Sequence, residues 1–189
     1  MGRRQRKAQR NKKVKPHIWV FCEGKTEENY VKLLRSKYRI PIDIITKQVG
    51  NKITDSFIRN HKRGVPQHKK DMNFLMYDAD DAGVLERIKS IKTAKLLVSN
   101  PSIELWFLLH YKNQKASITG RACIEELSKR NRVKYNKVVI DKRLSEKLNE
   151  QTYKACTRAA ELKQFKNPSS NIYEFIHALD DLTNESHES

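Results

Sequence analysis

Cysteine is scarce in this sequence, and long apolar runs are absent from it. The three cysteines, Cys22, Cys123 and Cys156, are far apart and form no CxxC pair, which excludes a paired-cysteine zinc site and a disulfide framework. No stretch of about 18 apolar residues occurs, so the sequence predicts neither a transmembrane span nor the apolar core of a signal peptide. We therefore expect a soluble, cytoplasmic protein with reduced thiols and no membrane partner.

Acidic residues are too few to balance the basic ones. The chain of 189 residues has 39 Lys and Arg against 22 Asp and Glu, a formal charge of +17. Residues 1–15 contain eight basic residues and no acid, and the remainder still carries +9. Such an excess attracts polyanions through counterion release, so we expect a nucleic acid, RNA or DNA, as partner. The predicted contacts in this segment are Arg3, Arg4, Arg6, Lys7 and Arg10.

The same basic segment has a second interpretation of equal weight. Charge runs of this kind are also typical of disordered arms that only keep a protein in solution. A membrane surface suits the segment less well, because residues 1–15 lack an apolar face.

Short apolar segments alternate with helical patterns in the first half of the chain. This alternation predicts an α/β fold with a mostly parallel, four-stranded, Rossmann-like sheet flanked by helices, because each parallel connection needs a crossover. The length predicts one domain, residues 16–183, after a basic disordered arm, 1–15, and before a frayed tail, 184–189. The expected strands are 17–22, 42–46, 73–77 and 95–99, and the expected helices between them follow Gly24 and cover 53–61 and 84–91.

The second half of the chain has a helical pattern. Asn100 and Pro101 are expected to open a buried helix over 103–111, with Asn100 as its N-cap. Thr119 is expected to cap the next helix, and Asn167 the last one. Residues 144–162 predict one or two further helices. The apolar stripe around Trp106 suits either the core or a homodimer interface.

Acidic residues follow two of the predicted strands directly. Glu23 comes after the first strand, and Asp78, Asp80 and Asp81 come after the third. Ligands of open α/β sheets bind at this carboxyl edge, and clustered carboxylates repel one another unless a cation lies between them. Oxygen ligands of this kind suit Mg²⁺ or Mn²⁺, which could activate water against a phosphodiester. Alternatively, the aspartates serve as turn formers or helix caps.

Glu23 is the acid that turn chemistry explains least well. It joins a strongly apolar strand to a glycine and a helix start, and we expect Thr26 to provide the N-cap of that helix. A carboxylate at position 23 would therefore add nothing as a cap.

Four motifs in order along residues 17–182 resemble one family: CEGKTEENY at 22–30, DAD at 78–80, NPSIELWFLLHY at 100–111 and NPSSNIYEFI at 167–176. This is the RloB family, also called AbiLii-like abortive-infection proteins, which are built on a Toprim fold. The resemblance implies a Toprim-like centre with Glu23, Asp78 and Asp80 around a divalent metal. It also implies a prokaryotic antiphage setting with an ATPase encoded nearby. Ala79 and Ala82 stand where family members often carry a basic residue and a histidine.

Further residues are candidates for supporting roles around that centre. Lys25 could neutralise a phosphate, although solvated lysines are commoner. Glu104 could point back towards the metal edge or simply favour a helix N-terminus. Six residues separate Glu104 from His110, so the two do not share a helix face, and His110 is more simply a core histidine than a general base. The full supporting set is Glu27, Asn100, Glu104, His110, Asn167 and Asn171.

These observations favour a metal-dependent nuclease of Toprim type as the main hypothesis. In it, Glu23 serves as metal ligand or general base, Asp78 and Asp80 bind Mg²⁺ or Mn²⁺, and Lys25 contacts the substrate. Related Toprim effectors that cut nucleic acid suggest tRNA or DNA as substrate, which is an analogy. The alternative is a non-catalytic module that binds nucleic acid or a partner protein through its basic surface.

Overall fold

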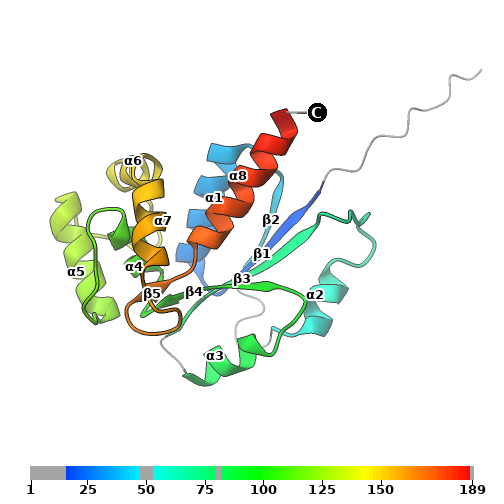
Figure 1. Ribbon diagram of the computed structural model, residues 1–189, viewed down its shortest axis with the longest axis horizontal. Helices are drawn as coiled ribbons and strands as arrows, with labels where there is room; N and C mark the ends of the chain where they lie inside the picture. Colours follow the sequence, from blue (N-terminus) through cyan, green and yellow to red (C-terminus); the bar gives the residue numbers. More distant parts are fainter. Residues whose placement is uncertain (1–15, 47–52, 80–81, 188–189) are drawn as a thin grey trace, which may run out of the picture.

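A mostly parallel sheet forms the centre of the molecule (Figure 1). The computed structural model describes residues 16–46, 53–79 and 82–187. The sheet has five strands in the order β2-β1-β3-β4-β5, of which the first four are parallel and β5 pairs antiparallel with β4. The strands are β1 Ile18–Cys22, β2 Ile42–Thr46, β3 Met72–Asp78, β4 Lys95–Asn100 and β5 Ser169–Ser170. The predicted α/β class is confirmed.

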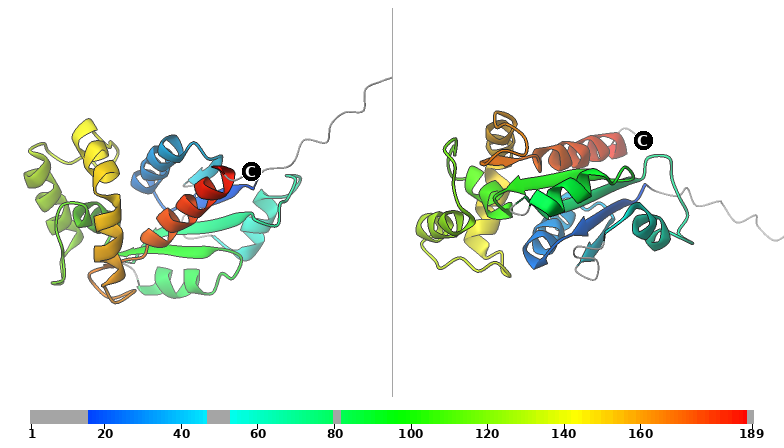
Figure 2. Two further views of the ribbon diagram at one scale, coloured as in Figure 1. Left: turned by 45° about the horizontal axis from the view of Figure 1, so that its top comes forward. Right: turned by 90° about the horizontal axis from the view of Figure 1, so that it is seen from below.

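Helices cover both faces of the sheet, as Figure 1 shows for the pair α1 and α8 and for the pair α2 and α3. A second group of helices, α4 to α7, lies beyond the carboxyl ends of the parallel strands (Figure 2). The helices are α1 Lys25–Tyr38, α2 Asp55–His61, α3 Ala82–Lys89, α4 Ile103–Leu109, α5 Gly120–Asn131, α6 Lys142–Glu150, α7 Thr152–Ala160 and α8 Tyr173–His187.

The central strand β1 is buried on both faces, which explains its continuous apolar sequence. Because side chains alternate along a strand, Val20 packs with α1, α4 and α8, whereas Trp19 and Phe21 pack with α2 and α3. Trp106 on α4 is fully buried within the chain, so the stripe around it belongs to the core.

The fifth strand was not predicted, and it changes the role expected of Asn167. The last helix begins at Tyr173, so the prediction that Asn167 caps it is wrong. Between them, Ser169 and Ser170 pair with Asn100 and Ser99 of β4. The Asn171 side chain extends this pairing, because its Oδ1 accepts from Val98 N at 2.6 Å and its Nδ2 donates to Leu96 O at 2.8 Å.

Two of the other three expected helix caps, those at Thr26 and Asn100, also differ from the prediction. Gly24 occupies the N-cap of α1, and the Thr26 hydroxyl instead donates to Lys137 O at 2.8 Å. Ser102 occupies the N-cap of α4, while Asn100 ends β4 and donates to Phe165 O at 3.1 Å. Thr119 does cap α5, since its hydroxyl accepts from Ala122 N at 3.2 Å.

Residues 142–160 form two helices, α6 and α7, where one or two were expected over 144–162; α6 begins two residues earlier than expected. Helix α8 continues to His187, so most of the segment expected to fray is helical. Among the described residues, no helix is both long enough and apolar enough to cross a membrane.

Candidate functional site

Glu23 and Asp78 meet at the carboxyl edge of the sheet. The backbone N–H of Glu23 continues the ladder beyond β1 by donating to Met76 O at 3.0 Å. The side chain of Glu23 then accepts the N–H of Asp78 at its Oε2, over 2.9 Å. The sheet therefore brings together two of the acids singled out in the sequence, whereas Asp80 lies outside the described residues.

Asp78 also joins this edge to helix α4. Its Oδ1 accepts the backbone N–H of Ile103, the first residue of α4, at 2.8 Å. The first N–H groups of a helix have no partner within the helix. The side chain of Ser102, the N-cap residue of α4, does not accept a hydrogen bond from them. A carboxylate from β3 thus takes the place of a local cap and fixes α4 against the sheet.

Two further carboxylates, Glu27 on α1 and Glu104 on α4, complete an acidic centre of four side chains with Glu23 and Asp78. Glu27 is 5% exposed and Glu104 is 1% exposed. Burial, followed by the charges of Glu23 and Glu104, raises the pKa of Glu27 to about 7 against backbone hydrogen bonds that lower it. Burial likewise raises the pKa of Asp78 well above its usual value, with further contributions from Glu27, Glu104 and Glu23. The four carboxylates therefore interact electrostatically as one group.

Gly24 leaves the space that the Glu27 carboxylate occupies. A Cβ atom at position 24 would lie 2.9 Å from Glu27 Oε2, closer than such atoms approach one another. The backbone of Gly24 is extended, with φ at −139°, so a side chain here would meet only the end of the Glu27 side chain, which would have to shift.

Glu104 is held by groups from two other segments. Ser102 Oγ donates to Oε2 at 2.6 Å, and the hydroxyl of Tyr135 donates to Oε1 at 3.2 Å. Lys137 Nζ lies 3.9 Å from the same Oε1. Nothing in the local sequence pattern marks Tyr135 or Lys137, because they follow α5 and reach Glu104 only through the fold.

Lys25 does not contact the acidic centre. Its Nζ lies 2.9 and 3.0 Å from the two carboxylate oxygens of Glu28, an ion pair within the first turn of α1 that Lys32 shares. Its predicted role as a phosphate contact would require this ion pair to open.

His110 is buried away from the acidic centre. Its Nδ1 lies 2.9 Å from Trp106 O, and because a carbonyl only accepts, Nδ1 carries the proton. Burial lowers the pKa of His110 to about 3, so the ring is neutral. This geometry matches the expected core histidine better than a general base.

The three predicted asparagines have structural partners instead. Asn100 bonds to the segment before β5, and Asn171 bonds to β4 as described above. Asn167 pairs with the backbone of Ile118 in both directions, at 2.9 Å through Oδ1 and at 2.8 Å through Nδ2. They hold the segment around β5 in place and lie outside the acidic centre.

The donor chemistry of the acidic centre fits a hard divalent cation. All four side chains offer carboxylate oxygens. A cation among them would offset both the burial of charge and the mutual repulsion that raise the pKa values of Glu27 and Asp78. Within residues 16–46, 53–79 and 82–187, however, no three His, Cys, Asp or Glu side chains converge closely enough to ligate one ion as they stand.

Comparison with families of known proteins gives one match, to the RloB-like protein family over residues 18–179. This chain belongs to the RloB-like family. The matched range covers the sheet, all four motifs and nearly the whole of the helical half, so the family assignment made on those motifs is confirmed. Searches of curated proteins and of solved structures found no match.

Proposed function

We propose that this RloB-like protein is a metal-dependent nuclease that hydrolyses phosphodiester bonds in RNA or DNA. The observation that carries the proposal is the acidic centre, in which Glu23, Glu27, Asp78 and Glu104 come together where β1 and β3 end and α1 and α4 begin. Glu27 and Asp78 carry a cost that a bound cation would offset, because both are desolvated and lie near other carboxylates.

The residues of the chain have distinct parts in this proposal. Glu23 and Asp78, with Asp80 from the segment after β3, would hold Mg²⁺ or Mn²⁺, and such an ion supplies charge neutralisation and activation of water. Ile103 N orients Asp78, while Ser102 and Tyr135 orient Glu104. Gly24 keeps room for Glu27 at the same edge.

The test is cleavage of labelled RNA and DNA by the purified protein with Mg²⁺ or Mn²⁺. We expect Asp78→Asn to reduce the rate by at least about 100-fold, because removing charge stabilisation at a reacting phosphate has effects of that order. Glu125→Gln is the matched control, since Glu125 is an exposed carboxylate on α5. Cleavage by Asp78→Asn at the wild-type rate would show that the acidic centre is not the active site.

A second candidate is a non-catalytic module that binds nucleic acid. It is favoured by the hydrogen bonds that already occupy Glu104 and by the lack of a ready ligand set among the described residues. Such a module would bind nucleic acid equally well with and without a chelator, and Glu23→Gln would not alter the binding. A nuclease would instead lose turnover in the presence of the chelator.

The biological setting remains part of the proposal. We infer from the family resemblance that cleavage serves antiphage abortive infection in a prokaryote, together with an ATPase encoded nearby. Plating phage on cells that carry the pair of genes, with wild-type protein or Asp78→Asn, tests this. Equal protection by both versions would contradict a nuclease effector.

A further inference from the structure

A concentration of positive charge follows the end of α5 and continues into α6. Residues 129–147 include eight Lys or Arg against two acids. Arg130 and Lys142 form ion pairs on their own helices with Glu126 and Glu146, at 3.2 and 3.9 Å. The other six form what we call the α5–α6 basic surface, in which only Lys137 lies at ion-pair distance from an acid among the described residues, 3.9 Å from Glu104: Lys129, Arg132, Lys134, Lys137, Arg143 and Lys147.

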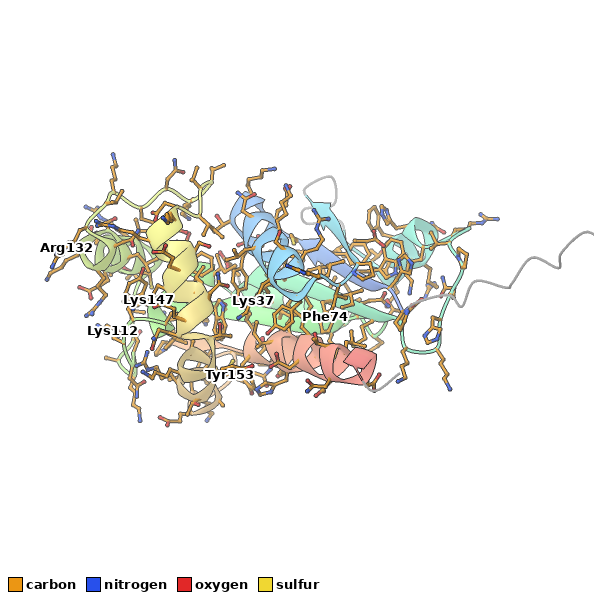
Figure 3. All side chains as sticks on the ribbon, turned by 90° about the horizontal axis from the view of Figure 1, so that it is seen from above. Lys37, Phe74, Lys112, Arg132, Lys147 and Tyr153 are labelled. Carbon is orange, nitrogen blue, oxygen red and sulfur yellow. The ribbon has the colours of Figure 1, made fainter. Side chains whose placement is uncertain are left out.

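An open pocket lies within this surface. Its volume is about 360 Å³, in the range of small-ligand sites, and Arg132, Arg143 and Lys147 line it together with Tyr111. Arg130, Glu146 and Glu150 also contribute to the lining, so four cationic side chains face two acidic ones. Figure 3 shows Arg132 and Lys147 at the same end of the molecule, beside α5 and α6. The pocket therefore presents a positive environment to an anionic ligand.

The loop between α5 and α6 links this pocket to the acidic centre. Lys137 Nζ lies 3.9 Å from Glu104 Oε1, and Tyr135 donates to the same oxygen. Helix α1 holds the loop from the other side, because Thr26 Oγ1 donates to Lys137 O at 2.8 Å and Asn29 Nδ2 donates to Val138 O at 2.5 Å. The path from the pocket to the carboxylates therefore runs along an anchored segment of chain.

We propose that the α5–α6 basic surface binds the phosphate backbone of a nucleic acid and directs it to the acidic centre. Lys and Arg side chains supply most phosphate contacts in such interfaces, and Arg can bind a phosphate through two parallel hydrogen bonds. Arg132 and Lys134 are exposed and form no ion pair within the part of the chain that the structure describes. The inference rests on the proposed function in taking the bound strand to be the substrate.

A nucleic acid fits this surface better than an anionic membrane does. A helix that binds membranes presents a continuous apolar stripe to the lipid. The apolar residues of α6, Leu144 and Leu148, are buried in the core instead. The exposed apolar side chains here are valines of the loop, Val133, Val138 and Val139, which are small enough to contact bases and sugars beside the phosphates.

The experiment compares two triple variants that remove the same charge from opposite edges of the sheet. The first is Lys129→Gln, Arg132→Gly and Lys134→Gln. The control is Arg39→Gly, Lys69→Gln and Lys95→Gln; Arg39 and Lys69 precede β2 and β3, and Lys95 is the first residue of β4, all at the amino edge. All six residues are exposed.

The two arginines make the comparison closely matched. Arg132 and Arg39 both follow a helix in the left-handed conformation, with φ of 55° and 54°. Glycine suits that conformation, so both replacements preserve or improve folding. Any difference in binding between the triple variants therefore comes from the position of the charge.

Every protein in this experiment, including the parent, also carries Asp78→Asn, so that no substrate is cleaved. Binding of labelled single-stranded RNA, and of DNA of the same sequence, is measured by fluorescence anisotropy in EDTA. Each phosphate contact to a single strand contributes about 0.7 to the steepness of the fall of log K with log salt. At 0.15 M salt, one such contact therefore strengthens binding about fourfold relative to 1 M salt. We expect the first variant to bind about 50-fold more weakly, with a slope smaller by about 2, and the control to bind as the parent does.

Nucleic-acid binding that is weakened equally in both triple variants would overturn the proposal. The total charge of the protein, and not the α5–α6 basic surface, would then account for binding. A second result would also overturn it: the first triple variant binds nucleic acid as the parent does but no longer binds vesicles of anionic phospholipid. That result would indicate that the surface binds membranes. Binding is measured without metal or turnover. The expected pattern in a protein that never cleaves would therefore support nucleic-acid binding at the α5–α6 basic surface and contradict the nuclease proposal, with its claim that the bound strand is the substrate.

Discussion

Replacing Glu27 with glutamine should make the protein more stable at pH 8 than the wild type. Burial, followed by the charges of Glu23 and Glu104, raises the pKa of Glu27 from an ordinary 4.5 to about 7. The folded state therefore holds a proton that the unfolded state releases between these pH values, and the contribution of Glu27 to stability falls as pH rises through this window. Above pH 7 the full cost applies, about 3 kcal/mol.

Glutamine keeps the shape and the acceptor oxygen of Glu27 but carries no charge. Urea unfolding of wild type and Glu27→Gln should therefore differ by about 3 kcal/mol at pH 8 and by less than about 1 kcal/mol at pH 5. Glu125→Gln, an exposed control on α5, should change stability by less than about 0.5 kcal/mol at either pH. A Glu27→Gln variant that unfolds like the wild type at pH 8 would show that burial and the neighbouring carboxylates do not raise the pKa of Glu27 in the folded protein.

Two further predictions concern the metal and the edge of β4. Mg²⁺ at about 100 times its Kd should stabilise the wild type by about 2.7 kcal/mol and raise its Tm, whereas Asp78→Asn should show no such rise; equal stabilisation of both would place the ion elsewhere. Asn171→Ala should lower the free energy of unfolding by about 2 to 4 kcal/mol, because Val98 N and Leu96 O lose their buried partner. Urea unfolding checks this against Asn149→Ala, an exposed control on α6, and a loss below about 0.5 kcal/mol would contradict it.

Much of the sheet could be predicted because burial on both faces leaves a direct trace in the sequence. The apolar segments of β1 and β3 match the predicted strands to within a residue or so. Strand β5 left no such trace, since it consists of Ser169 and Ser170 alone. It forms only because β4 offers a free edge and Asn171 continues the pairing.

The predicted caps show why local patterns were insufficient at helix starts. Thr26 and Asn100 have the residue types of N-caps, but each bonds to a distant backbone carbonyl instead. The N-terminus of α4 is satisfied by Asp78, which is 25 residues earlier in the chain. A long-range contact that meets the same hydrogen-bonding need removes the reason for a local cap.

The sequence alone determined the class of fold, because short apolar strand segments alternate with helical patterns along the chain. It also determined the family through the four motifs, and it placed Glu23 and Asp78 at one edge because both follow predicted parallel strands directly. Tertiary structure decided which other groups join them. Glu27 and Glu104 become part of the acidic centre, and Tyr135 and Lys137 reach it, only when α1, α4 and the loop after α5 pack together. Electrostatic interaction depends on distance and burial, and neither quantity is present in the order of the residues.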